Sequence, residues 1–163
     1  MNGASLLPEF DQEMANTRKA LERVPDDELS FKPHQKSYSL LELASHVANI
    51  PTWTSVTLTT TELDLDEPFD RTLPTDRAGV LAQFDEAVSA ARSTLEETSA
   101  EDMLVDWTLR SGDQVWFTLP RAAVFRSFVM SHLIHHRAQL TVYLRLLDVP
   151  VPGMYGPSAD EQT

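Results

Sequence analysis

The chain has 163 residues and a formal net charge of −12, which repels phosphate backbones and anionic membranes and argues against nucleic-acid or membrane partners. It contains no cysteine, so disulfides, thiolate metal ligands and a cysteine nucleophile are all excluded. No signal-peptide pattern is visible, and no apolar run comes near the ~18 residues of a membrane span, so we expect one cytoplasmic domain over residues 1–163.

Two amphipathic helices are predicted in the first third of the chain. In residues 4–23, apolar side chains recur at steps of three and four and form one apolar face. A second helix is predicted to begin after Ser39, because Ser39 and Glu42 match a capping box. Its inward face contains Leu43, His46, Ile50 and Trp53. Residues 54–60 are rich in threonine, and their composition leaves both a continued helix and a strand open.

The middle of the chain is predicted to contain a loop, a surface helix and a short extended excursion. Residues 64–79 are acidic and contain prolines, which favours a loop. Residues 76–97 have apolar side chains on one side and charged ones on the other, as expected of a surface helix. In residues 103–119 the turn sequence SGDQ separates two β-favouring runs, which predicts a small hairpin or another extended structure.

The last predicted helix covers residues 120–147 and opens at Pro120, a residue suited to a first helical turn. Residues 148–163 are rich in proline and glycine and are expected to form an extended tail. Four helices with one β-like excursion before the last of them predict an all-α four-helix bundle.

Histidines gather within residues 131–140, SHLIHHRAQL, which otherwise have the pattern of a buried helix. His132 and His136 are four residues apart and therefore lie one turn apart on the apolar face. Two imidazoles at this spacing can chelate one divalent ion, and His46 on the second helix is the candidate third ligand. Spacing alone leaves a second interpretation open, in which these are core histidines bonded to backbone carbonyls or to Tyr143.

His135 competes with His136 for the role of ligand, because it lies three residues from His132. We favour His136, whose helical neighbours are apolar, whereas those of His135 indicate a wetter face. His34 falls in a loop and is expected to be solvated. The residue after His132 is Leu133 and not glutamate, which argues against the H-E-x-x-H motif of zinc peptidases.

Two stretches carry a family resemblance. They are LLELASHVANI, with its central histidine, and SHLIHHRAQLTVYLRLLDVPVPGMYG, which is similar to an H-x-x-x-H-R-G-Q helix followed by a tail with proline and tyrosine. With these features in this order, the sequence resembles the DinB-like family of bacterial four-helix metal-binding proteins. Ala138 stands where that motif has glycine, a mild departure that helix propensity favours.

The resemblance implies the ligands and the cofactor. By position, it assigns the three metal-binding histidines to His46, His132 and His136, and it implies that residues 52–61 continue the second helix. The implied cofactor is a divalent metal ion, with zinc or nickel preferred and iron or manganese as alternatives. Family members are commonly homodimers, and we expect the same state here.

The resemblance also implies a class of chemistry. Related enzymes are thiol transferases and thiol-dependent isomerases, so we expect a metal-dependent thiol S-transferase or isomerase that takes its low-molecular-weight thiol from a cosubstrate. The alternative is a non-catalytic metal or small-ligand binding protein of the stress response. No catalytic residue can be assigned. Arg137 and Arg121 are candidates to steer a cosubstrate carboxylate, with solvated surface charges as the other interpretation. Tyr155 is placed either over the site or against the bundle.

Overall fold

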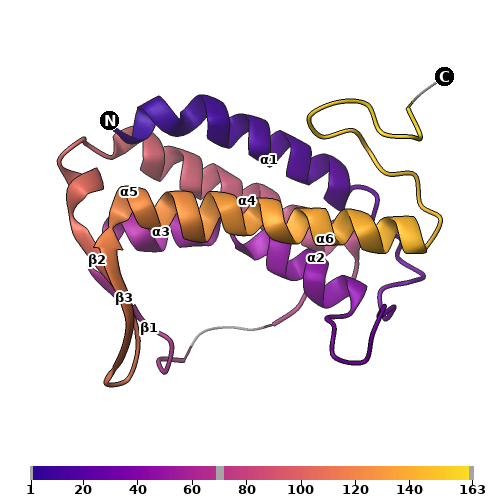
Figure 1. The fold of residues 1–163 in the computed structure, drawn as a ribbon, viewed down its shortest axis with the longest axis horizontal. Helices are drawn as coiled ribbons and strands as arrows, with labels where there is room; N and C mark the ends of the chain where they lie inside the picture. The colour runs from indigo at the N-terminus through magenta and orange to yellow at the C-terminus, as the bar shows by residue number, and fades with distance from the viewer. Residues whose placement is uncertain (1, 69–71, 162–163) are drawn as a thin grey trace.

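The computed structural model describes residues 2–68 and 72–161. Within these residues the chain forms four helical segments that run side by side and one small sheet at an end of the bundle (Figure 1). The segments are a 3-10 turn (Gly3–Leu6) leading into α1 (Leu7–Leu21); α2 (Leu40–Asn49) followed by α3 (Thr52–Thr59); α4 (Arg77–Glu97); and α5 (Arg121–Val124) continuing to α6 (His132–Leu146). A short 3-10 turn, Asp102–Leu104, precedes the hairpin.

The helix starts follow from capping residues that the sequence displays. Ser39 and Glu42 form the expected capping box, in which Ser39 Oγ accepts the amide of Glu42 and the Glu42 carboxylate accepts the amide of Ser39. Asp76 caps α4 by accepting the Gly79 amide at 2.8 Å. These caps fix where α2 and α4 begin, and both predicted helices are confirmed.

Residues 52–59 are helical, so a strand at 54–60 is wrong, and the helix that the family resemblance implied for residues 52–61 is confirmed as far as Thr59. Thr54, Thr57 and Leu58 are buried, and α3 packs against α4. This burial outweighs the weak helix propensity of threonine, a few tenths of a kcal/mol per residue. Thr59 Oγ1 also donates to the Ser55 carbonyl within the helix, which satisfies its hydroxyl.

The sheet contains β1 (Glu62–Asp64), β2 (Asp106–Ser111) and β3 (Gln114–Pro120), in that order. The β2–β3 pair is antiparallel and confirms the predicted hairpin, with Gly112 at φ 54° in its turn. β1 pairs in parallel with β2, which the sequence does not predict. Arg110 of β2 forms ion pairs with Glu62 and Asp64 and so helps to hold this three-residue strand. The prediction of an all-α architecture is therefore incomplete, because a small sheet accompanies the helices.

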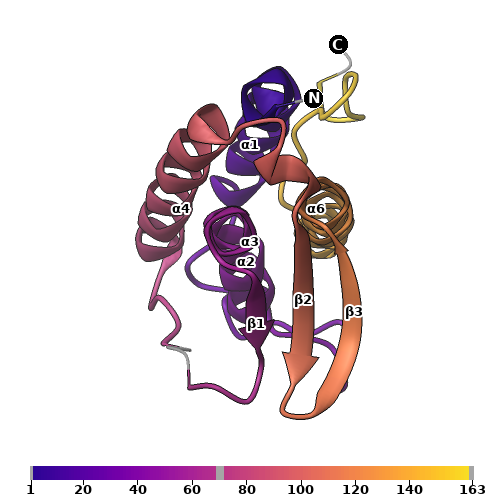
Figure 2. The same ribbon diagram turned by 90° about the vertical axis from the view of Figure 1, so that its left-hand side faces the viewer.

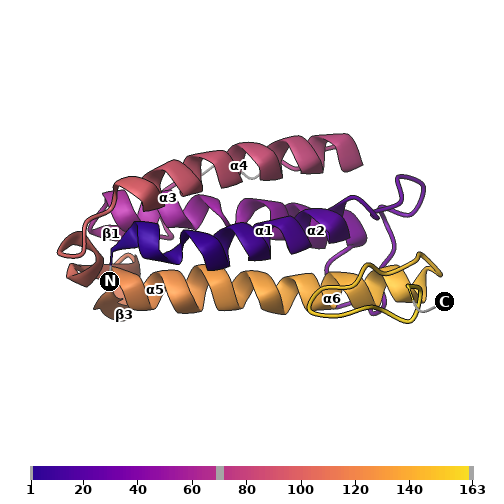
Figure 3. The same cartoon turned by 90° about the horizontal axis from the view of Figure 1, so that it is seen from above.

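The core lies where the helical segments meet. Figures 2 and 3 show α2 and α3 between α4 and the α5–α6 segment. α1 covers one side of this layer and contacts both α4 and α6. Large side chains from different segments are fully buried there, among them Phe10, Phe84, Phe125, Leu133 and Leu140. Each contributes about 1.5–3 kcal/mol by burial. No helix in the described part of the chain combines the length and apolar composition that a bilayer crossing requires.

The last helical segment carries a π-helical stretch, Phe125–Ser131, directly before α6. A π-helix bonds each amide to a carbonyl five residues earlier, so it shifts the faces of the helix that follows. His132 is the first residue of α6 and comes immediately after this shift. The π-helical stretch therefore sets the direction in which the α6 histidines point.

The described tail, residues 148–161, contains no helix or strand and packs against the bundle. Tyr155 Oη donates to a Glu13 carboxylate oxygen at 2.9 Å and accepts from Arg137 at 2.6 Å. Asn16 of α1 donates to the Met154 carbonyl at 3.0 Å. Tyr155 thus packs against the bundle through α1 and α6, which decides between the two placements considered for it.

Candidate metal centre

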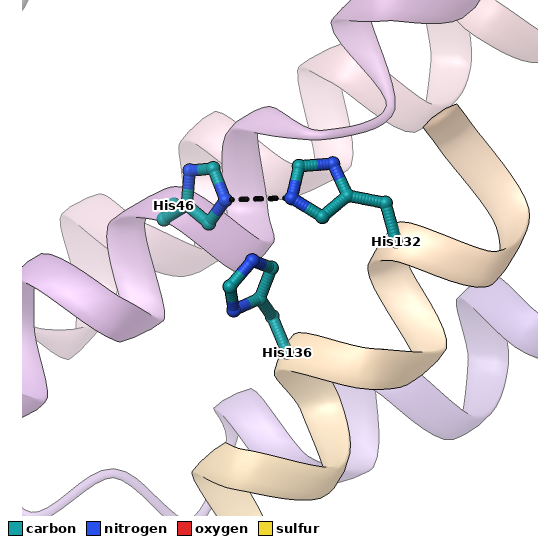
Figure 4. A group of neighbouring side chains, drawn as sticks. All are labelled: His46, His132 and His136. Atoms are coloured by element: carbon teal, nitrogen blue, oxygen red, sulfur yellow. Dashed lines mark hydrogen bonds between the residues drawn. The ribbon is translucent and has the colours of Figure 1, made fainter. Parts of the chain in front are cut away.

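Two helices bring three histidines together (Figure 4). His46 comes from the last turn of α2, and His132 and His136 come from the first two turns of α6. Their ring centroids are 5.1 Å apart for His46 and His132, 4.5 Å for His46 and His136, and 4.6 Å for the α6 pair. The residues predicted from spacing therefore converge, although 86 positions separate His46 from His132 in sequence.

The nitrogen spacing fits a divalent ion. The Nε2 atoms of His46 and His132 are 3.3 Å apart, and one nitrogen from each of the three rings lies within 4.8 Å of the others. Two imidazole nitrogens bound to a tetrahedral zinc ion, at roughly 2.0–2.1 Å each, lie about 3.3 Å apart. Hence two of the rings already stand at ligand spacing, and the cluster can hold a metal.

The other nitrogens of the α6 rings are occupied by neighbours on the same helix. Nδ1 of His136 lies 2.7 Å from Gln139 Oε1, which can only accept, so Nδ1 carries the proton and Nε2 is left bare. His132 bonds to the Phe128 backbone, and since its Nε2 faces His46, Nδ1 makes that bond. Partners of this kind orient metal-ligating histidines and fix their tautomers.

Burial lowers the pKa of all three imidazoles. The pKa of His46 falls to about 4, chiefly because burial disfavours the charged ring and further because His136 and His132 lie close. Burial is also the largest cause of the lowered pKa of His132 and of His136. At neutral pH the rings are therefore uncharged, which is the form that donates a lone pair to a metal ion.

Two surface cavities border the histidines from opposite directions along α6. The first, about 370 Å³, is here called the Lys36 cleft and is lined by residues 36–38 of the loop before α2, Leu43 of α2, and His136, Gln139, Val142 and Tyr143 of α6. The second, about 320 Å³, is here called the Phe128 recess and is lined by Ser127, Phe128, Ser131, His132 and His135. Small molecules can therefore reach the cluster from either side.

The remaining histidines stay outside the cluster. His135 is exposed, with its ring 4.9 Å from that of His136, so the structure groups His136 and not His135 with His46. His34 is exposed in the loop before α2, where its Nδ1 accepts the Lys36 amide at 3.1 Å. Tyr143 Oη donates to the Tyr38 carbonyl, so the hydrogen bond from Tyr143 to a histidine considered above is not formed.

Both arginines considered above are buried, so their interpretation as solvated surface charges is wrong. Arg137 is only 2% exposed and pairs with the Glu13 carboxylate at 2.7 Å, on the side of α6 that faces α1. Arg121 donates to the Thr60 carbonyl at 2.6 Å. A guanidinium can be buried when a carboxylate or carbonyls satisfy it. Arg137 is satisfied in this way, whereas Arg121 bonds to carbonyls only through its terminal nitrogens and its buried Nε has no partner among the described residues.

Sequence reasoning also missed the residues that support the cluster. Gln139, three positions after His136, is a helical neighbour, so its spacing was a usable signal. The Phe128 carbonyl and the Lys36 cleft had no comparable signal, because they depend on a π-helical stretch and on the folding of a loop.

Comparisons with known proteins identify the family. The sequence model described as the DinB family matches residues 1–163. This chain belongs to the DinB family. It is 28% identical over 157 residues to the uncharacterized protein YrdA of Bacillus subtilis strain 168, a match that covers 95% of this chain and 89% of that protein.

Solved structures of DinB-like proteins share the fold. One from Bacillus cereus ATCC 10987 aligns with a TM-score of 0.72 at 24% identity, over 92% of this chain and 95% of the other. YjoA of Bacillus subtilis aligns with a TM-score of 0.70 at 17% identity, over 90% and 95% of the two chains. The DinB-like fold, including its small sheet, is therefore the architecture of this chain.

Proposed function

We propose that this DinB-family protein binds one divalent metal ion through His46, His132 and His136 and uses it to activate a low-molecular-weight thiol for transfer to an electrophile. The observation that supports this most is the arrangement of the nitrogens, with the Nε2 atoms of His46 and His132 facing one another at 3.3 Å, where they share one hydrogen bond. When bound, a divalent ion supplies Lewis acidity that favours the ionised form of a thiol. The chain has no cysteine, so that thiol comes from a cosubstrate.

The chain's own residues prepare the site in two ways. Burial keeps the three imidazoles uncharged at neutral pH, so protons do not compete for their lone pairs. Gln139 and the Phe128 carbonyl hold the α6 rings in the tautomer that directs Nε2 to the centre. Zinc or nickel suits three imidazoles best, with iron or manganese as alternatives.

The first test is metal content. Elemental analysis of untagged protein, purified without chelator, should find about one metal ion per chain, and His132→Ala should lose it. His135→Ala is the matched control, because it removes an imidazole on the same helix that lies outside the cluster. Equal metal content in the two variants, or none in the native protein after zinc or nickel is supplied, would contradict the proposed ligand set.

The second test is turnover. Consumption of a small thiol with a generic electrophile should require the metal and should be lost in His46→Ala while His135→Ala retains it. Turnover that persists in His46→Ala would exclude this mechanism, whatever the metal content.

The competing proposal is a non-catalytic metal or small-ligand binding protein. It is favoured by the linings of the Lys36 cleft and the Phe128 recess, which contain no aspartate or glutamate among the described residues to act as general acid or base. It predicts that metal raises the unfolding temperature without turnover of any thiol. The family resemblance also supports a homodimer, which sedimentation of the metal-loaded protein tests directly.

A further inference from the structure

The Lys36 cleft is continuous with the histidine cluster, since His136 forms part of its wall. Tyr38 lines the same cleft, and its ring lies 6.0 Å from the ring of His46. A molecule whose head group is bound at the three histidines can therefore extend into this cleft. The volume of about 370 Å³ is in the range of pockets that hold small molecules.

The loop that closes the cleft is organised by its own hydrogen bonds. The Ser37 amide donates to the His34 carbonyl at 2.9 Å, which makes a tight turn around Lys36. Tyr143 Oη donates to the Tyr38 carbonyl at 3.0 Å and so ties the loop to α6. A cleft preformed in this way binds a ligand without ordering the loop first.

Lys36 is the only charged residue in the lining that the structure describes. Lys36 forms no ion pair with any described residue, whereas nearby Lys32 is paired with Glu42 at 3.5 Å. The chain as a whole carries a charge of −12, which repels anions, so an anionic ligand needs a local cation of this kind. One ammonium group balances the single charge of a carboxylate, and the described lining holds no second cation for a dianion.

We propose that the Lys36 cleft binds the carboxylate end of a small ligand whose other end is held at His46, His132 and His136. The inference rests on the metal site proposed above and defines the class of cosubstrate as a short thiol that carries a carboxylate. The apolar part of the lining, Leu43 and Val142, contacts the carbon chain between the two ends.

The test measures dissociation constants by isothermal titration calorimetry on the zinc-loaded full-length protein. The probes are 3-mercaptopropionate and its neutral amide, 3-mercaptopropionamide, which have similar size and differ in charge. Native protein should bind the carboxylate about threefold to fivefold more tightly than the amide, the effect of one exposed charge pair. Lys36→Gln should abolish this preference, and Lys19→Gln, which removes an exposed lysine on α1 that does not line the cleft, should retain it.

A second pair of probes separates the two proposals. Succinic acid monohydroxamate and its amide bind zinc without a thiol and differ in the same charge. A preference for the carboxylate that survives in Lys36→Gln, or that is absent from native protein in both pairs, overturns the role of the cleft. If neither thiol binds, the proposed thiol chemistry fails and the hydroxamate pair alone decides the cleft. Binding by neither pair to zinc-loaded protein overturns both proposals.

Discussion

Replacing Glu13 by glutamine should destabilise the protein strongly, because it removes the only carboxylate that pairs with Arg137 in the described structure. The two side chains are 8% and 2% exposed, and the Arg137 guanidinium also donates to the Glu13 carbonyl at 3.0 Å and to Thr17 at 3.2 Å. Glu13→Gln leaves a buried cation without its counter-charge, a change that costs roughly 3–5 kcal/mol. Because the Glu13 carbonyl and the Thr17 hydroxyl still accept hydrogen bonds from Arg137, we expect a loss at the lower end of this range, about 3 kcal/mol.

The matched control is Glu9→Gln, one turn earlier on the same helix. Glu9 pairs with Arg126, but both side chains are nearly half exposed, so its loss should cost less than about 1 kcal/mol. Urea unfolding followed by far-UV circular dichroism, with chelator present to remove metal, gives the free energy of unfolding of each variant. In thermal unfolding, a loss of about 3 kcal/mol corresponds to a decrease in Tm of about 6–12 °C.

A double-mutant cycle tests the reasoning behind this number. Arg137→Met alone leaves the Glu13 carboxylate buried without a counter-charge, with the Tyr155 hydroxyl as its remaining side-chain donor. Glu13→Gln combined with Arg137→Met leaves no charge at either position. We expect a coupling free energy above about 2 kcal/mol between the two positions. A Glu13→Gln variant within about 1 kcal/mol of Glu9→Gln would refute the claim that this ion pair is effectively buried.

Three further predictions concern the histidine cluster. Gln139→Leu should weaken zinc binding about 10–100-fold in competition with a chromophoric chelator, because His136 loses the acceptor that fixes its tautomer. In metal-free protein, the unfolded state takes up a proton on His46 near pH 6.5 and the folded state only near pH 4, so stability should fall as the pH drops through this window and level off below it. The loss should be about 1–2 kcal/mol after allowance for partial exposure, and it should shrink in His46→Leu measured over the same pH range. Deleting Ser127, which shortens the π-helical stretch by one residue, should abolish zinc binding while far-UV circular dichroism still reports a helical protein.

Local signals in the sequence were sufficient for most of the helices and for the ligand candidates. The capping box at Ser39 and Glu42 depends on residues three apart, and the spacing of His132 and His136 depends on one helical turn. Such features are readable because the interacting groups are close along the chain. His46 lies on another helix, so its place on the inward face of that helix made it only a candidate third ligand, and the family resemblance supported the same assignment.

The features that were missed depend on contacts between distant segments. Arginine is usually a surface residue, and Arg137 is buried because it pairs with Glu13, 124 positions away on α1. β1 is only three residues long and exists because β2 lies beside it. The π-helical stretch before His132 has no sequence signature of its own, because tertiary packing selects it over an α-helix. A single sequence carries least information about contacts of this kind, between segments that are far apart along the chain.

The segment from His136 to Gln139 shows how one helical turn can serve the whole site. Successive helical residues are rotated by about 100°, so His136 and Arg137 point in different directions. His136 faces α2 and the cluster, and Arg137 faces α1 and the Glu13 carboxylate. The Gln139 side chain accepts a hydrogen bond from Nδ1 of His136. A proposed ligand, an anchor that fixes the rotation of α6, and a group that fixes the tautomer of the proposed ligand are thus encoded within four residues. Because α6 cannot rotate without breaking the buried ion pair of Arg137, the anchor holds both α6 histidines toward His46.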